Sequence, residues 1–148
     1  MKTEIQPPTY FAALLLISGV SHFLFPAPKV IEPPYAYLGL LAIVFGVVLN
    51  LWADSLFKKS KTTVKPQKMP TSLLVSGPFR ISRHPMYLGM AAILLGEAVV
   101  LGSVATFAFP LIFAIMMEVL FISKEEKNLE RAFGKEYLDY KRSVRRWI

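Results

Sequence analysis

The chain contains no cysteine among its 148 residues, and only 18% of its residues are charged. The absence of cysteine excludes disulfide bonds and thiolate metal sites, and we expect no metal centre. Apolar side chains, in contrast, make up 54% of the residues, and the mean hydropathy is +0.47. This composition is too apolar for an ordinary soluble domain of this size and indicates a polytopic membrane protein.

Four apolar stretches dominate the sequence, at residues 10–25, 35–57, 86–101 and 104–122. A helix that spans the membrane needs about 20 apolar residues, so the first and third stretches are short unless flanking residues extend them. Only Gly102 and Ser103 separate the last two stretches, which predicts a tight helical hairpin. We interpret the first stretch as a helix rather than a cleaved signal peptide, because Lys2 is offset by Glu4 and no small-residue cleavage site follows cleanly.

The predicted fold class is therefore all-α, a polytopic membrane helical bundle with four transmembrane helices. We expect one integral membrane domain over residues 1–148. Its first part, residues 1–70, would contain two helices and a basic polar linker that runs from Lys58 to Pro70. Its second part, residues 71–148, would contain the helical hairpin and a cytoplasmic amphipathic helix at the C-terminus.

Lysine and arginine are distributed unevenly about these helices. Of the 17 in the chain, Lys29 alone falls on the side that holds the loop between the first two stretches. Cytoplasmic loops of membrane proteins are enriched in lysine and arginine, so the pattern predicts that both termini are cytoplasmic. Membrane topology thus explains the net charge of +7, and nucleic acid is not an expected partner.

Small residues mark the helix faces that we expect to pack closely. Gly39 and Gly46 are seven residues apart in the second stretch, and Gly89 and Gly96 repeat that spacing in the third. Such residues let helix backbones approach one another in lipid. Pro110 lies near the start of the fourth stretch and predicts a kink there.

Four ionisable residues lie within or near the apolar stretches: His22, Asp54, Glu97 and Glu118. We interpret His22 as bonded to neighbouring backbone, Asp54 as interfacial, and Glu97 as structural or interfacial. A carboxylate at the depth of Glu118 costs roughly 2.5 kcal/mol or more on insertion scales. Glu118 also precedes Glu125 by seven residues on one helix face, and whether it lines a polar cavity is left open.

Two polar stretches flank the predicted hairpin. The first, SGPFRISRHPMYLG, runs from Ser76 to Gly89, and the second, SKEEKNLERAFGKEYLDYKRSVRRWI, covers residues 123–148. Within the second, an amphipathic stripe is formed by Leu129, Phe133, Tyr137 and Tyr140, and Gly134 should break or bend its helix. The basic end of this stretch is expected to contact anionic membrane lipid.

The hairpin would bring these two stretches together at the cytoplasmic face. A cavity there would be lined by Arg83, His84, Tyr87, Glu125 and Glu126. It would present hydrogen-bond donors, carboxylates and an aromatic ring beside an apolar bundle. Such a site suits a polar cytosolic cofactor that meets a lipid-soluble substrate.

The two stretches together resemble the isoprenylcysteine carboxyl methyltransferase family and its wider relatives, which include phospholipid methyltransferases. The resemblance is carried by GPFRISRHPMYLG, with its RHP-x-Y-x-G pattern, and by EEKNLERAFGKEYLDY after the hairpin. It covers about half of the chain, from Ser76 to the end, whereas the N-terminal half matches only in hydrophobic character. The resemblance implies a membrane methyltransferase that transfers a methyl group from S-adenosylmethionine to a lipophilic acceptor.

The resemblance also implies a set of cofactor-binding residues: Arg83, His84, Pro85, Met86, Tyr87, Gly89, Glu125 and Glu126. Basic side chains and the N–H groups at a helix start can hold acceptor groups, carboxylates can accept from an ammonium or from hydroxyls, and Tyr87 can pack on adenine. No glycine-rich strand–turn–helix signal for a soluble cofactor-binding sheet is present. Because the sulfonium is already activated, the protein mainly aligns the reactants and excludes water, and we assign no catalytic base.

The acceptor is less well defined by the sequence. A carboxylate acceptor of the isoprenylcysteine type would need an orienting arginine, and the candidates are Arg142, Arg145 and Arg146. Relatives commonly carry an arginine where this chain has Ser143, so a lipid, a prenylated protein and a small hydrophobic molecule all stay open as acceptors.

Two alternatives to a methyltransferase are considered. The C-terminal pattern also resembles that of membrane sterol and steroid reductases, which bind a nicotinamide cofactor such as NADPH at a similar place. The second alternative is a non-enzymatic lipid-binding membrane module. Cofactor binding distinguishes the three possibilities, because they predict binding of a sulfonium cofactor, of a nicotinamide cofactor, or of neither.

Overall fold

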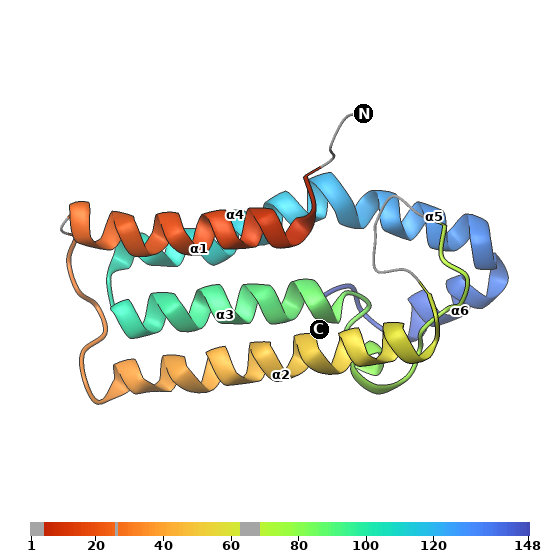
Figure 1. Ribbon diagram of the computed structural model, residues 1–148, viewed down its shortest axis with the longest axis horizontal. Helices are drawn as coiled ribbons and strands as arrows, with labels where there is room; N and C mark the ends of the chain where they lie inside the picture. The colour runs from red at the N-terminus through yellow and green to blue at the C-terminus, as the bar shows by residue number, and fades with distance from the viewer. Residues whose placement is uncertain (1–4, 26, 63–68) are drawn as a thin grey trace.

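The computed structural model describes residues 5–25, 27–62 and 69–148, and the elements in these ranges are helical apart from one isolated bridge between Lys29 and Ser103. The α-helices are α1 (Pro7–Leu24), α2 (Leu38–Lys59), α3 (Pro85–Leu101), α4 (Ala108–Met117), α5 (Ser123–Phe133) and α6 (Lys135–Ser143) (Figure 1). Three 3-10 turns, at Tyr35–Tyr37, Gly77–Arg80 and Val104–Phe107, and a π-helical turn at Glu118–Ile122 connect or interrupt them. The predictions on Lys2, Glu4 and most of the linker concern positions outside the described residues.

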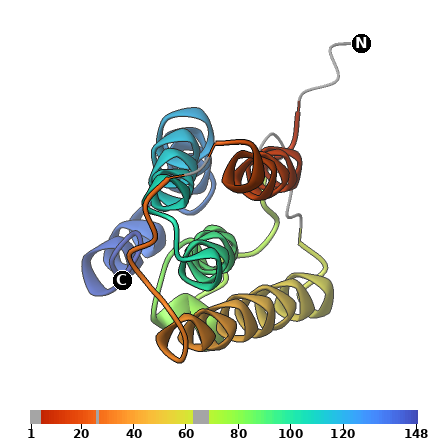
Figure 2. The same ribbon diagram turned by 90° about the vertical axis from the view of Figure 1, so that its left-hand side faces the viewer.

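Helix α3 occupies the centre of the bundle. The end-on view in Figure 2 shows α1, α2 and α4 arranged around it, and α3 contacts all three. Both α1 and α3 begin with a proline at their first position, Pro7 and Pro85, where the missing N–H has no partner to lose. Helix α3 ends at Leu101 and is capped by Gly102, whose φ of 68° is a left-handed conformation that glycine adopts without steric cost.

The apolar helices are of unequal length. Among the described residues, three segments are long and apolar enough to cross a membrane, namely Pro7–Leu24, Tyr35–Lys59 and Val104–Phe133. Helix α3 is also apolar but has only 17 residues. The prediction of an all-helical protein built from apolar helices is therefore confirmed, whereas the number of spans depends on whether α3 crosses the membrane.

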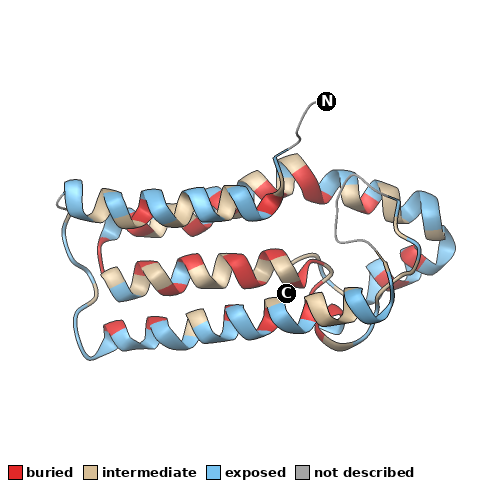
Figure 3. Ribbon diagram, viewed as in Figure 1, coloured by how far each residue is buried: buried red, intermediate tan, exposed pale blue. Residues whose placement is uncertain are grey.

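Much of the apolar surface lies on the outside of the bundle. Figure 3 shows exposed residues along the outer face of α2, and large hydrophobic side chains are exposed there, including Leu40, Leu41, Val44, Val48 and Leu51. An apolar face of this extent is typical of a surface that meets other apolar groups rather than water. Lipid is the natural environment for such a face in a bundle of long apolar helices.

Helices α2 and α3 make the most extensive contact between helices in the described part of the chain. The four predicted packing glycines lie at this contact: a Cβ on Gly96 would lie 2.5 Å from the carbonyl oxygen of Gly39, and one on Gly89 would lie 2.8 Å from that of Gly46. No side chain fits between backbones at these distances. The prediction of close helix packing through glycine is confirmed.

The last membrane-length segment changes its helix type along its course. Pro110 is the third residue of α4, so it lies in the first turn, where its missing N–H is tolerated. The 3-10 turn at Val104–Phe107 gives way to the α-helix just before it. A second irregularity, which nothing in the sequence signals, is the π-helical turn at Glu118–Ile122.

The chain turns sharply between α5 and α6. Gly134, with φ of 50°, separates the two helices, which confirms the predicted break. The stripe residues on either side then pack together: Tyr137 and Tyr140 are buried in a cluster with Ala53 and Phe79, against which Leu129 and Phe133 pack. This cluster holds α6 against the end of α2.

Candidate functional site

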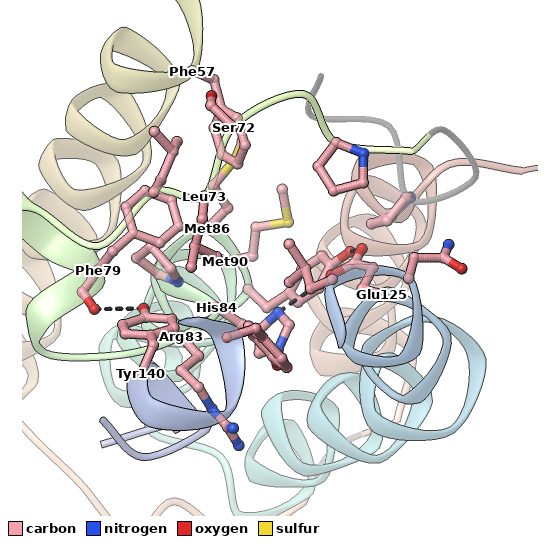
Figure 4. Close-up of a pocket in the computed structure, with 18 of the residues that line it drawn as sticks. Phe57, Ser72, Leu73, Phe79, Arg83, His84, Met86, Met90, Glu125 and Tyr140 are labelled. Atoms are coloured by element: carbon pink, nitrogen blue, oxygen red, sulfur yellow. Dashed lines mark hydrogen bonds and ion pairs between the residues drawn. The ribbon is translucent and has the colours of Figure 1, made fainter. Parts of the chain in front are cut away.

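A cavity of about 320 Å³ lies at the end of the bundle where α3 begins. Its walls come from the starts of α1 and α3, the end of α2, residues 70–74, and helices α5 and α6 (Figure 4). Most of the lining side chains are apolar, among them Phe57, Leu73, Met86 and Met90. Sites for small molecules have this character, roughly 300–1,000 Å³ in volume and mainly apolar with a few polar groups.

His84 provides the polar centre of the cavity wall. It caps the N-terminus of α3, and its ring lies between two glutamates of α5, with Nδ1 3.2 Å from Glu125 and Nε2 3.4 Å from Glu126. Tyr87, which also lines the cavity, stacks against the His84 ring with centroids 5.8 Å apart and donates its hydroxyl hydrogen bond to Glu125. These contacts fix the start of α3 to α5.

Glu126 lies behind this wall, only 3% exposed, and is not among the cavity-lining residues. Its carboxylate pairs with Nη2 of Arg83 at 3.0 Å and accepts hydrogen bonds from Arg146, from Nε at 2.9 Å and from Nη2 at 2.6 Å. A buried carboxylate is stable only when it is paired and hydrogen-bonded in this way. Glu126 therefore joins the His84 turn to the C-terminus of the chain.

The protonation of His84 is set by these two carboxylates. Burial alone would lower the pKa of His84, but hydrogen bonds and charge attraction from Glu125 and Glu126 outweigh burial, so the pKa is raised above its ordinary value of 6.5. A protonated ring can donate from both nitrogens, one to each glutamate. The two glutamates therefore favour the charged form of the ring more than water would.

Two tyrosines of α6 complete the polar lining. Burial raises the pKa of Tyr137 to about 12, and burial likewise raises the pKa of Tyr140, so both hydroxyls stay protonated at neutral pH. Tyr140 donates to the carbonyl oxygen of Phe79 at 2.6 Å. The buried hydroxyl of Tyr137 has no partner among the described residues, and neither does that of Ser72.

The predicted cofactor residues fall into two groups. Six of them line the cavity, namely Arg83, His84, Pro85, Met86, Tyr87 and Glu125. Gly89 and Glu126 do not, because Gly89 packs against Gly46 and Asn50 of α2 and Glu126 faces the arginines. These two residues therefore pack behind the cavity-lining residues and do not face the cavity.

The three predicted acceptor arginines all lie outside the cavity lining. The side chain of Arg142 is 82% exposed, 3.7 Å from Asp139, and Arg145 is also exposed. Arg146 is instead held by Glu126 and by Glu118, to which its Nη1 donates. Glu118, whose place in a polar cavity the sequence leaves open, is not among the cavity-lining residues. Its carboxylate binds Arg146 and accepts from Trp147 Nε1 at 3.2 Å.

Asp54 and His22 differ in whether their side chains are paired. Asp54 forms an ion pair of 2.5 Å with Lys58 at the end of α2, as an interfacial carboxylate can. His22 packs edge-on against Phe23, and its buried Nδ1 has no hydrogen-bond partner within the described ranges. The backbone bond expected for His22 is therefore not made by this nitrogen.

Several cavity residues were not predicted. The start of α1 contributes Gln6, Pro7 and Pro8, and the segment after the linker contributes Leu73 and Leu74. These residues are separated from the two motifs in sequence and carry no chemical signal of their own. Tyr137 was signalled only as part of the amphipathic stripe.

The fold and the site together define a helical membrane protein with a small-molecule cavity, polar on one wall, at one end of an apolar bundle. Residues 35–136, more than half of the chain, match the phospholipid methyltransferase family. The chain belongs to that family.

Two further comparisons concern a relative and a fold. An uncharacterized protein of Haemophilus influenzae is 40% identical over 63 residues, which are 43% of this chain and the whole of that protein. The fold is similar to that of a eukaryotic intramembrane Ras methyltransferase, isoprenylcysteine carboxyl methyltransferase, with a TM-score of 0.69 and 22% identity. The comparison covers all of this chain and 53% of that one, so the chain spans about half of its length. The likeness concerns the fold, and the long apolar helices of this chain are what indicate an integral membrane protein.

Proposed function

We propose that the protein is a membrane methyltransferase that uses S-adenosylmethionine and acts on a lipophilic acceptor. One observation carries the proposal: in a member of the phospholipid methyltransferase family, His84, Tyr87 and Glu125 form a polar wall beside an apolar cavity. A polar cofactor needs the polar wall, and a lipophilic acceptor needs the apolar lining. We further propose residues 71–148 as the catalytic part, with the start of α1 and the end of α2 completing its cavity.

The residues present fit the cofactor. The hydroxyls of Tyr137 and Ser72 are buried in the lining without partners in the described part of the chain. A buried polar group left unpaired costs about 1–3 kcal/mol, so a ligand that pairs with these hydroxyls would recover that cost. The cofactor carries hydroxyls, an ammonium and a carboxylate that suit such groups, and its adenine suits an aromatic neighbour such as Tyr87.

Each residue then has a role that its chemistry allows. When bound, the cofactor supplies a methyl group already activated by a sulfonium. His84 would hold the Glu125 carboxylate in place, Glu125 would accept from the ammonium or hydroxyls of the cofactor, and the apolar lining would exclude water. Arg83, Gly89 and Glu126 would support this arrangement, Arg83 as the counter-charge of Glu126 and Gly89 through its contact with α2.

The acceptor is proposed to approach from the apolar side of the cavity. Phe57, Leu73 and Leu74 form part of that side, and an acyl or prenyl chain would be compatible with them. Arg142 and Arg145 are exposed near the same end of the bundle and stay candidates for an acidic group of the acceptor, whether lipid or isoprenylcysteine. Arg146 is less suited to that role because its guanidinium already pairs with two carboxylates.

Titration calorimetry of the detergent-purified protein with S-adenosylhomocysteine tests the proposal, with NADPH as a parallel titrant. We expect S-adenosylhomocysteine to bind. We expect His84→Ala to weaken that binding while the protein stays helical by circular dichroism. Binding of NADPH alone would replace the proposal with a reductase. If the folded protein binds neither titrant, a non-enzymatic lipid-binding module would be favoured.

A further inference from the structure

The last five residues, Val144–Ile148, return to the turn that precedes α3. The backbone N–H of Arg83 donates to the carbonyl oxygen of Arg145 at 3.1 Å, and Ser82 Oγ donates to that of Arg146 at 3.0 Å. Ser82 Oγ in turn accepts from the backbone N–H of His84 at 3.1 Å. A continuous chain of hydrogen bonds thus connects the C-terminal segment to the backbone of His84.

The side chain of Arg146 makes a second connection. Its guanidinium donates twice to Glu126, at 2.9 and 2.6 Å, and once to Glu118. Such a forked pair with a carboxylate fixes direction as well as charge. Glu126 then presents Oε1 to His84 Nε2 at 3.4 Å, so Arg146 is one residue removed from the cavity wall without lining the cavity.

Glu118 anchors this arrangement from the membrane side. It is the first residue of the π-helical turn, and its carboxylate receives both Arg146 Nη1 and Trp147 Nε1. Single π-helical turns inside α-helices frequently occur at functional sites. An acidic residue at this depth is costly unless it is paired, and here its partners come from the C-terminal segment.

We propose that Arg146 is a positioning residue of the cofactor site. It acts through Glu126 and through the backbone of Ser82 to hold the His84 ring between Glu125 and Glu126, and Glu118 holds Arg146 in turn. The role given to the His84 wall rests on the proposed function, whereas the contacts of Arg146 do not. The C-terminal segment is therefore part of the cofactor half of the site.

The test compares Arg146→Gln, Glu118→Gln and the double variant, with Arg131→Gln as a matched control on the exposed surface of α5. We expect Arg146→Gln to weaken S-adenosylhomocysteine binding by about tenfold, within the range measured for coupled neighbours. Glu118→Gln should weaken it less, the double variant should equal Arg146→Gln, and Arg131→Gln should leave it unchanged. Arg146→Lys, which keeps the charge but loses the fork, should recover only part of the loss.

Additive losses in the double variant, or unchanged binding in Arg146→Gln, would overturn the proposal. If Arg146→Gln does not fold, Glu118→Gln decides by the same measure, because Glu118 lies outside the cavity lining and its carboxylate binds the C-terminal segment, through Arg146 and Trp147.

A second readout does not depend on the ligand. The chain has two histidines, so a His22→Gln background leaves His84 as the only imidazole seen by NMR. We expect Arg146→Gln to shift the His84 ring resonances of the ligand-free protein and Arg131→Gln to leave them in place. Unmoved resonances would overturn the positioning role. If the wild-type protein binds no S-adenosylhomocysteine, the proposed function fails, and this readout still decides the role of Arg146.

Discussion

At the scale of single residues, Glu126 is the carboxylate on which most neighbouring charges converge. Arg83 and Arg146 pair with it, and its side chain is only 4% exposed. We expect Glu126→Gln to lower the free energy of unfolding by about 3–5 kcal/mol, because it leaves positive charge without compensation in a buried place. Chemical unfolding in detergent measures the change.

The matched control is Glu130→Gln, one turn further along α5, where the side chain is exposed. It should change stability by no more than about 0.5 kcal/mol, as is usual for surface substitutions. Equal stability of the two variants would show that Glu126 is not held by its arginines as described.

His84 gives a prediction on pH. Its pKa is raised in the folded protein by Glu125 and Glu126, so its contribution to stability is fully present below its unfolded value of 6.5 and is lost as the pH rises through the raised value. The stability difference between wild type and His84→Gln should therefore be largest below about pH 6.5 and should shrink as the pH rises through the raised pKa. Unfolding at a series of pH values measures it, and a difference that grows with pH would mean that the ring is held neutral.

The residues of the wall were largely predictable, and their supports were not. His84, Tyr87 and Glu125 lie in two compact motifs on either side of a short hairpin, so spacing alone brings them together. Arg146 contacts glutamates 20 and 28 residues earlier in the chain. Nothing in its neighbourhood signals those partners, because they depend on how α5, α6 and the C-terminal segment turn in space.

At the scale of elements, the contact between α2 and α3 depends on backbone approach. Alanine normally favours a helix over glycine by about 1 kcal/mol, so Gly96→Ala should stabilise an isolated α3. Here the new Cβ would lie 2.5 Å from the carbonyl oxygen of Gly39, which cannot move aside as a side chain could. We expect Gly96→Ala to destabilise the protein by about 1–3 kcal/mol through overpacking.

Gly19→Ala provides the comparison for this prediction. Gly19 also lies in an apolar helix, but the atom nearest to its new Cβ, Oε1 of Glu97, would be 3.5 Å away, an ordinary contact. Thermal unfolding in detergent should show a lower midpoint for Gly96→Ala only. A midpoint that rises in both variants would mean that helix propensity outweighs the contact of α2 with α3.

Helix positions could be predicted better than helix irregularities. The predicted stretches at 35–57, 86–101 and 104–122 begin within a residue or so of helical segments, because apolar length and flanking proline or glycine mark the ends. The π-helical turn at Glu118–Ile122 carries no such mark. It accompanies the pairing of Glu118 with Arg146, a tertiary contact that local sequence does not encode.

At the scale of the whole molecule, the polar site lies at one end of the bundle and an apolar surface surrounds the rest. The starts of α1 and α3, the end of α2 and both C-terminal helices meet at that end (Figures 1 and 2). Lys29 is on the opposite end, beside Ser103. This arrangement agrees with the distribution of charge in the sequence, in which Lys29 stands apart from the other basic residues.

The number of spans determines on which side the chain ends. Helix α3 has 17 residues and so rises only about 25 Å at 1.5 Å per residue, somewhat less than a hydrocarbon core of about 30 Å. If α3 crosses with its flanking residues, both ends of the chain face the cytoplasm. If it does not, the three longer segments place the ends on opposite sides, an arrangement that the packing of α6 against the end of α2 disfavours.

Single-cysteine labelling decides between these topologies, and the absence of native cysteine removes any background. We expect Ser60→Cys and Ile148→Cys, at the end of α2 and at the C-terminus, to react with a membrane-impermeant maleimide only in inside-out vesicles. Glu32→Cys, in the loop between α1 and α2, should react only in right-side-out vesicles and serves as the opposite-side control. All three positions are exposed, so access to the reagent depends on the side of the membrane. Labelling of Ser60→Cys and Ile148→Cys from opposite sides would show that α3 does not span the membrane.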